Sequence, residues 1–198
     1  MKRVVSFLLT LCLLLTALLS GAALAEGSTQ ITIGLVGEPD TIIPYMYTAD
    51  KDAMVIMQMM PYLFKRNDET SIPEPLMLES CEFDADTLTY TWKLREGYTW
   101  TDGEPLTIDD VIFTLNTLAS ADYTGGASTN VSGIAGYAEA HSGETAGMSG
   151  VQKVDDYTMT VQLSAWDPTF LGYYCDPGAI LPEHVLSGVS FGDWAKTD

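Results

Sequence analysis

Basic residues, histidines and cysteines are all scarce in this sequence. The scarcity of basic residues and of histidines each argues against a class of function. The 198 residues include 9 Lys and Arg against 27 Asp and Glu, which gives a formal net charge of −18. Because nucleic-acid binding depends on clustered Lys and Arg, no nucleic-acid partner is expected. The two histidines, His141 and His184, have no Cys, His or acidic partner at metal-ligand spacing, so neither a metal nor another cofactor is expected.

Catalytic motifs are also missing from the sequence. There is no Gly-x-Ser-x-Gly elbow, no Walker loop and no dinucleotide-binding fingerprint. Carboxylates are plentiful, and a secreted hydrolase that uses two of them stays open as an alternative. However, the visible acidic pairs, such as Asp84 with Asp86 and Asp109 with Asp110, lie where a turn or a helix cap is predicted. We therefore expect a protein that is not an enzyme.

The first 25 residues have the pattern of an export signal. Lys2 and Arg3 precede an apolar run over residues 4–19, and a small-x-small cleavage site ends at Ala25. The run is shorter than the ~20 residues that a membrane-spanning helix needs. Cys12 lies inside this run after a leucine, which is a poor site for lipid attachment. The mature protein is thus expected to be free in a periplasm or outside the cell.

Two cysteines, Cys81 and Cys175, remain in the predicted mature chain. An exported protein can hold a disulfide, but the sequence does not show whether these two residues meet. Two half-buried small hydrophobic residues are the favoured interpretation.

Hydrophobic periodicity predicts a mixed α/β domain. Alternating apolar residues predict strands over residues 30–35 and 88–94, and a hairpin over 151–163. Residues 52–60 are apolar nearly all round, which predicts a helix buried on most sides and ended by Pro61. Thr107 and Asp110 form a capping-box pattern that starts a second helix, over residues 108–118.

The stretch 120–150 is rich in Gly, Ser, Ala and Thr, and predicts a loop or a loosely held insertion. A short helix is predicted near His184, at the end of the chain.

Several segments, in order, resemble the family 5 extracellular solute-binding proteins of ABC importers. Residues 37–44 are similar to the family pattern GEPxxLxP, and residues 75–82 to PxLAESWE with Cys81 in place of Trp. Residues 88–111 resemble LTYTFKLREGVKWxDGxPLTADDV, and residues 151–163 resemble GVKVVDDYTVxxxL. Any one motif is weak, whereas the ordered set is specific.

This resemblance implies an α/β fold, a type II periplasmic-binding-protein-like lobe with an extra subdomain, truncated before the second lobe. Residues 1–25 would be the signal peptide and 26–60 the start of lobe I. Residues 61–165 would form the extra subdomain, and 166–198 would return into lobe I. The family's ligand cleft lies between two lobes, so we expect this chain alone to bind ligand weakly or not at all.

The function implied by the resemblance is capture of a peptide or other small solute outside the cytoplasm, and its delivery to ABC permease subunits in the membrane. The protein is expected to be a monomer. The nickel branch of the family uses an arginine in the region of residues 170–184. This sequence has no arginine there, so the resemblance disfavours nickel-chelate uptake. A truncated remnant that no longer binds ligand is a further alternative.

The segment after Pro44 lies at the ligand cleft in this family, and two other regions approach it. An extended peptide could pair its backbone with such a segment, and tyrosines would supply flat walls and hydroxyls. Packing or turn roles stay open for every candidate. The candidate ligand-binding residues are Tyr45, Tyr47, Thr48, Asp50, Tyr123, Cys175 and Asp176.

Overall fold

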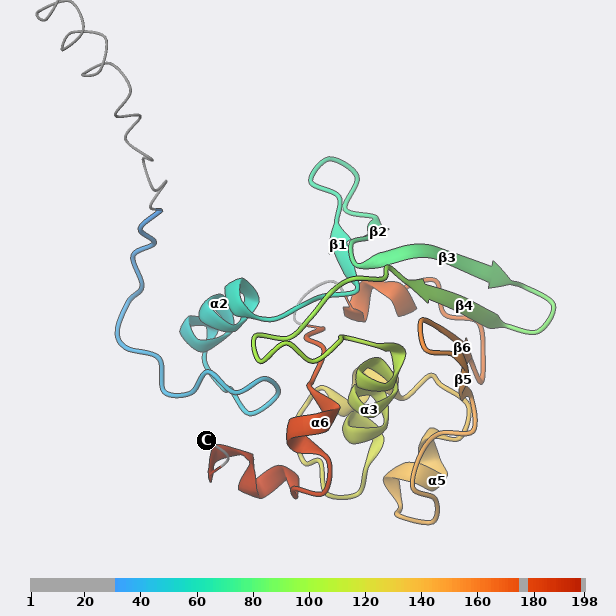
Figure 1. Ribbon diagram of the computed structural model, residues 1–198. Coiled ribbons are helices and arrows are strands. Elements are labelled where there is room, and N and C mark those ends of the chain that lie inside the picture. The colour runs from blue at the N-terminus through green and yellow to red at the C-terminus, as the bar shows by residue number, and fades with distance from the viewer. Residues whose placement is uncertain (1–30, 175–177, 197–198) are drawn as a thin grey trace, which may run out of the picture. The chain divides into compact units, whose positions relative to one another are not determined.

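A computed structural model describes residues 31–174 and 178–196 of the protein (Figure 1). The chain divides into two units, Met1–Leu35 and Val36–Asp198. The predicted signal peptide lies outside the described residues. In the described part of the chain, no helix has both the length and the apolar character needed to cross a membrane.

Residues 31–35, the described part of the first unit, form no strand, so the prediction of a strand over 30–35 is wrong there. Ile31 and Ile33 are 80% and 57% exposed. Alternating side chains make a strand only where a second strand supplies backbone hydrogen bonds. Residues 31–35 belong to neither of the two described sheets.

The second unit is organised around a four-stranded antiparallel sheet with strand order β3-β4-β6-β5. A two-stranded ribbon, β1-β2, precedes the sheet in the chain. The strands are β1 (Phe64–Arg66), β2 (Pro73–Pro75), β3 (Leu78–Asp84), β4 (Thr89–Leu94), β5 (Val151–Asp155) and β6 (Thr158–Gln162). The predicted strand over 88–94 and the predicted hairpin over 151–163 are therefore confirmed.

Alternation along β4 and β6 places one face of each strand in the core. Trp92 and Met159, which lie opposite each other in the register, are fully buried, as is Val161. Leu88 differs from the prediction, because it takes a left-handed backbone conformation (φ 54°) in the turn before β4. The strand therefore begins one residue later than expected.

Helix α3 (Ile108–Ala119) covers the core and begins at the predicted cap. The Thr107 hydroxyl accepts a hydrogen bond from the Asp109 amide at 3.3 Å, and the Asp110 carboxylate accepts one from the Thr107 amide at 2.9 Å. Figure 1 shows α3 between the β5-β6 hairpin and the short helix α6 (Glu183–Leu186). Helix α6 confirms the predicted helix near His184.

Helix α2 (Asp50–Met59) occurs where a helix is predicted, but its predicted burial on most sides is wrong. Met54, Met57 and Met59 are 47%, 37% and 58% exposed, and only Asp52 and Ile56 are buried. The helix therefore packs only along the stripe of Asp52 and Ile56, and its methionines face away from the core.

The small-residue stretch 120–150 is not a loosely held loop, and that prediction is wrong. It contains α4 (Ser128–Val131) and α5 (Tyr137–His141), and five of its apolar side chains are buried. Small residues permit this close packing, since a Cβ atom at Gly150 would lie 2.6 Å from the carbonyl oxygen of Gln162. The buried side chains are Tyr123, Val131, Ile134, Ala140 and Met148.

The C-terminal part of the described chain returns to the core through two 3-10 helices, η2 (Phe170–Tyr174) and η3 (Phe191–Lys196). The Phe170 ring stacks on Tyr90 at a centroid distance of 5.5 Å, and Tyr174 meets Trp92 edge-on at 5.3 Å. These contacts join η2 to the sheet. The boundaries predicted at residues 61 and 165 stay a prediction.

Candidate ligand-binding site

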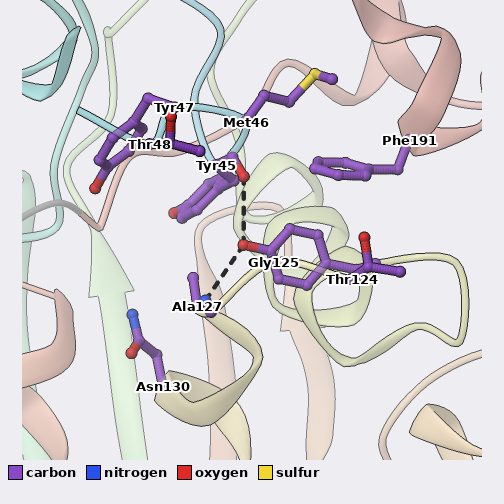
Figure 2. A pocket seen from close by; sticks show the side chains of 11 residues that line it. Tyr45, Met46, Tyr47, Thr48, Thr124, Gly125, Ala127, Asn130 and Phe191 are labelled. Carbon is purple, nitrogen blue, oxygen red and sulfur yellow. Dashed lines mark hydrogen bonds between the residues drawn. The ribbon is translucent and has the colours of Figure 1, made fainter.

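A cavity of about 670 Å³ opens between the segment that follows Pro44 and the residues around α4 (Figure 2). Its volume lies within the range of roughly 300–1,000 Å³ that is usual for small-molecule sites. The walls come from three parts of the chain that are distant in sequence. The lining residues are Tyr45, Met46, Tyr47, Thr48, Tyr123, Thr124, Gly125, Gly126, Ala127, Asn130 and Phe191.

The first wall is held in place through Tyr45. Its ring is buried, and its hydroxyl donates a hydrogen bond of 2.5 Å to the carbonyl oxygen of Ala179. The backbone of Tyr45 takes a left-handed conformation (φ 65°), which costs a non-glycine residue energy and needs support from its surroundings. The buried hydrogen bond supplies such support, and it fixes where residues 46–48 lie.

Tyr123 joins the first wall to the second. Its hydroxyl donates to the main-chain oxygen of Tyr45 at 3.4 Å and accepts from the amide of Ala127 at 3.3 Å, as the dashed lines in Figure 2 show. Its ring meets Tyr45 edge-on at 6.5 Å and Phe191 edge-on at 4.8 Å. One side chain therefore connects all three walls.

The lining phenols are neutral at physiological pH. Burial raises the pKa of Tyr45 well above its usual value. Burial also raises the pKa of Tyr47, helped by the carboxylate of Asp50, and it raises that of Tyr123 against the hydrogen bond from Ala127. The cavity therefore presents neutral aromatic surfaces to a ligand.

Gly125 is required by the position of the Tyr123 ring. A Cβ atom at residue 125 would collide with the hydroxyl end of that ring, whereas a Cβ at Gly126 would meet nothing within 4 Å. The first glycine thus permits close packing of Tyr123, whereas the second has open space where a side chain would lie.

The model of the bacterial extracellular solute-binding proteins, family 5 Middle, matches residues 73–198. The chain belongs to this family. The oligopeptide-binding protein AppA of Bacillus subtilis is 29% identical over 184 residues, which cover 90% of this chain and 31% of AppA. This solute-binding protein thus spans about a third of the length of that relative.

Solved structures give the same family relationship. The substrate-binding domain of an oligopeptide ABC transporter from Bacillus anthracis superimposes with a TM-score of 0.65 at 26% identity, over 72% of this chain and 28% of that one. AppA in complex with a nonapeptide superimposes with a TM-score of 0.61 at 27% identity, over 77% of this chain and 27% of AppA. The predicted α/β fold of a periplasmic-binding-protein lobe is confirmed, for the part of that fold that the chain covers.

The structure of this solute-binding protein brings four of the seven candidate residues together. Tyr45, Tyr47, Thr48 and Tyr123 all line the cavity. Asp50 is exposed at the first turn of α2 and is not part of the lining. The remaining candidates, Cys175 and Asp176, lie outside the described residues, and Cys81 is a partly buried free thiol.

Seven lining residues were missed by the sequence analysis. Gly125 and Gly126 lie two and three residues after Tyr123, but their small-residue surroundings favoured a loop over a cavity wall. Phe191 reaches the site only through folding, and no local pattern marks it. The missed residues are Met46, Thr124, Gly125, Gly126, Ala127, Asn130 and Phe191.

Among the described residues, no acidic side chain lines this cavity. The Asp84 carboxylate accepts hydrogen bonds from the amides of Asp86 and Thr87 in a turn, and that of Asp110 caps α3. Among residues 31–174 and 178–196, no group of three His, Cys, Asp or Glu residues could hold a metal ion. The described lining offers aromatic rings, hydroxyl groups, one side-chain amide and backbone groups to a ligand.

Proposed function

We propose that this protein is the extracytoplasmic substrate-binding component of an ABC importer, which captures peptides or similar small solutes and delivers them to a membrane permease. The relatives support this proposal, since AppA is an oligopeptide-binding protein whose structure was solved with a nonapeptide. The observation that carries it is the neutral, aromatic-walled cavity built on residues 45–48.

Backbone groups of the first wall suit a peptide ligand. The main-chain N–H groups of Tyr47 and Thr48 form no hydrogen bond with any described residue. Such groups can donate to the carbonyl oxygens of an extended peptide, as an exposed strand edge does. The rings of Tyr47 and Tyr123 would then cover apolar side chains of the ligand.

The alternative of a secreted hydrolase requires two carboxylates about 5–9 Å apart in one pocket. The described residues that line the cavity include no acid, and the acids Asp84 and Asp110 already have structural partners in a turn and a helix cap. This distribution favours binding over bond cleavage.

Calorimetric titration of the purified protein with mixed di- to pentapeptides tests the proposal. We expect a dissociation constant of about 1 mM, or about −4 kcal/mol, because an open cavity of this kind buries only part of a ligand. Tyr47→Ala should weaken binding at least threefold. Tyr98→Ala is the matched control, since Tyr98 is 38% exposed and lies outside the cavity. Absence of binding at about ten times that concentration would instead support the non-binding remnant.

A further inference from the structure

The third wall of the cavity is the ring of Phe191, which projects from η3. This ring meets Tyr123 edge-on at a centroid distance of 4.8 Å and Trp194 edge-on at 5.0 Å. Trp194 is itself buried, and its indole N–H donates to the carbonyl oxygen of Val189 at 3.3 Å. Contacts with two well-held rings fix the position of the Phe191 ring, so the cavity has a preformed apolar wall.

Met46 adds a second apolar side chain to the lining. Figure 2 shows Met46 and Phe191 toward one side of the drawn residues, and Tyr47 and Asn130 toward the opposite side. Met46 and Phe191 are both partly buried against the core, so each leaves some apolar surface open to a ligand. A methionine adapts its shape to a neighbouring group and makes favourable contacts with aromatic rings. These two side chains therefore suit an apolar group of variable shape.

The two buried phenols of the lining cannot donate a hydrogen bond to a ligand. The Tyr45 hydroxyl donates its one proton to the carbonyl oxygen of Ala179, and that of Tyr123 donates to the main-chain oxygen of Tyr45. The Tyr123 hydroxyl also accepts from the amide of Ala127. These groups are thus occupied in holding the walls together, and their rings offer mainly apolar surface.

The charge around the cavity is unfavourable to an acidic group. The described lining residues include no Lys, Arg or His, so a carboxylate that enters meets no cation. The charge that acts on Tyr47 is the carboxylate of Asp50, which is also negative. The protein as a whole has a formal net charge of −18, which repels an anion further. A carboxylate would therefore lose part of its water without gaining a partner of opposite charge.

We propose that the cavity binds an aromatic or large aliphatic side chain of the peptide against Phe191, and that it selects against an acidic side chain. This inference rests on the proposed function and adds the class of peptide side chain that the site prefers. Burial of apolar side-chain surface supplies the affinity, and edge-on or offset contact with the lining rings adds to it for an aromatic side chain.

The test compares four tripeptides, Ala-X-Ala, in which X is alanine, phenylalanine, glutamine or glutamate and both ends are free. All four share the same termini, so differences in the dissociation constant measured by calorimetry come from X. The phenylalanine peptide should bind about fivefold more tightly than the alanine peptide, as partial burial of a large side chain allows. The glutamate peptide should bind about threefold more weakly than the glutamine peptide, which has the same size and no charge.

Variants of Phe191 test the role of this side chain. Phe191→Ala should weaken the binding of the phenylalanine peptide more than that of the alanine peptide, and bring the two within about twofold of each other. Phe191→Leu keeps an apolar side chain and should keep part of the preference. Trp166→Ala is the matched control and should keep all of it, because Trp166 is a large aromatic residue, 56% exposed, that does not line the cavity.

Thermal unfolding followed by circular dichroism shows whether Phe191→Ala is folded, and Phe191→Leu gives a second reading if it is not. Equal binding of all four peptides, or tightest binding of the glutamate peptide, would overturn the inference while the proposed function stands. If Phe191→Ala keeps the full preference for phenylalanine, another wall binds the side chain and the inference is wrong. If none of the four peptides binds, the proposed function fails together with the inference.

Discussion

Replacing Asp110 tests whether the paired aspartates of α3 are structural. The Asp110 side chain is almost fully buried. One carboxylate oxygen accepts from the Thr107 amide at 2.9 Å and from the Trp100 indole N–H at 3.3 Å, and the other accepts from the Glu183 amide at 2.9 Å. One side chain therefore joins the turn before α3, the start of α3 and the start of α6.

The expected cost of Asp110→Ala follows from these three bonds. A hydrogen bond to a charged group contributes about 1.5–3 kcal/mol, and a buried donor left without a partner costs about 1–3 kcal/mol. The three losses overlap, and water can reach part of the site, so we expect a total of about 3 kcal/mol. In a protein of this size that lowers the melting temperature by about 6–12 °C. Asp110→Asn keeps one acceptor oxygen and should cost about 2 kcal/mol.

Asp109→Ala is the matched control, because it removes a carboxylate from the same turn of the same helix. Asp109 pairs with Lys153 at 2.6 Å, and both side chains are partly exposed. Lys153 also pairs with Asp156 at 2.9 Å, so it keeps a partner. An exposed pair of this kind contributes at most about 1 kcal/mol.

Urea unfolding monitored by circular dichroism measures both variants. The structure predicts that the Asp110 variant loses at least twice as much free energy of unfolding as the Asp109 variant. Equal losses would show that the buried hydrogen bonds of Asp110 do not hold α3 and α6 as described.

Three further predictions concern single sites. Gly125→Ala should lower the free energy of unfolding by about 1–3 kcal/mol, since a Cβ there collides with the Tyr123 ring, whereas Gly126→Ala should change it little. Chemical unfolding of both variants checks this prediction, and equal losses would contradict it. Burial raises the pKa of the Cys81 thiol to about 11, so iodoacetamide at pH 8 should modify it roughly a hundredfold more slowly in the native protein than in urea, and equal rates by mass spectrometry would refute the burial. The hydrogen bond from His184 lowers the pKa of Asp102, so the stability it adds is present above the usual Asp value of about 3.9 and is lost as the pH falls through the lower folded value. The unchanged protein should therefore have a higher free energy of unfolding than Asp102→Asn above about pH 4, and the difference should vanish below the folded pKa of Asp102. Equal free energies of unfolding above about pH 4 would contradict this prediction.

Local patterns were sufficient to predict several elements of this fold. The strand β4 and the hairpin β5-β6 follow from strict alternation, and α3 follows from the cap at Thr107. In each case, the side chains that decide the structure lie within a few residues of one another.

Features that depend on distant contacts could not be predicted in this way. The strand expected over 30–35 needs a backbone partner, and the exposure of α2 depends on which elements pack against it. Small residues in 120–150 indicate a loop until their close contacts are known. At the site, Tyr45, Tyr47, Thr48 and Tyr123 came from a family resemblance, whereas Phe191 and the buried bond to Ala179 appear only in the fold.

The most direct test of a peptide site on residues 45–48 is an amide-resolved NMR titration of the protein with a short unlabelled peptide. The structure predicts saturable shifts of the amide signals of Tyr47, Thr48, Gly125 and Gly126, with little change in the strands of the sheet. Saturable shifts confined to the sheet, with those four signals unmoved, would place the ligand elsewhere and contradict the site described.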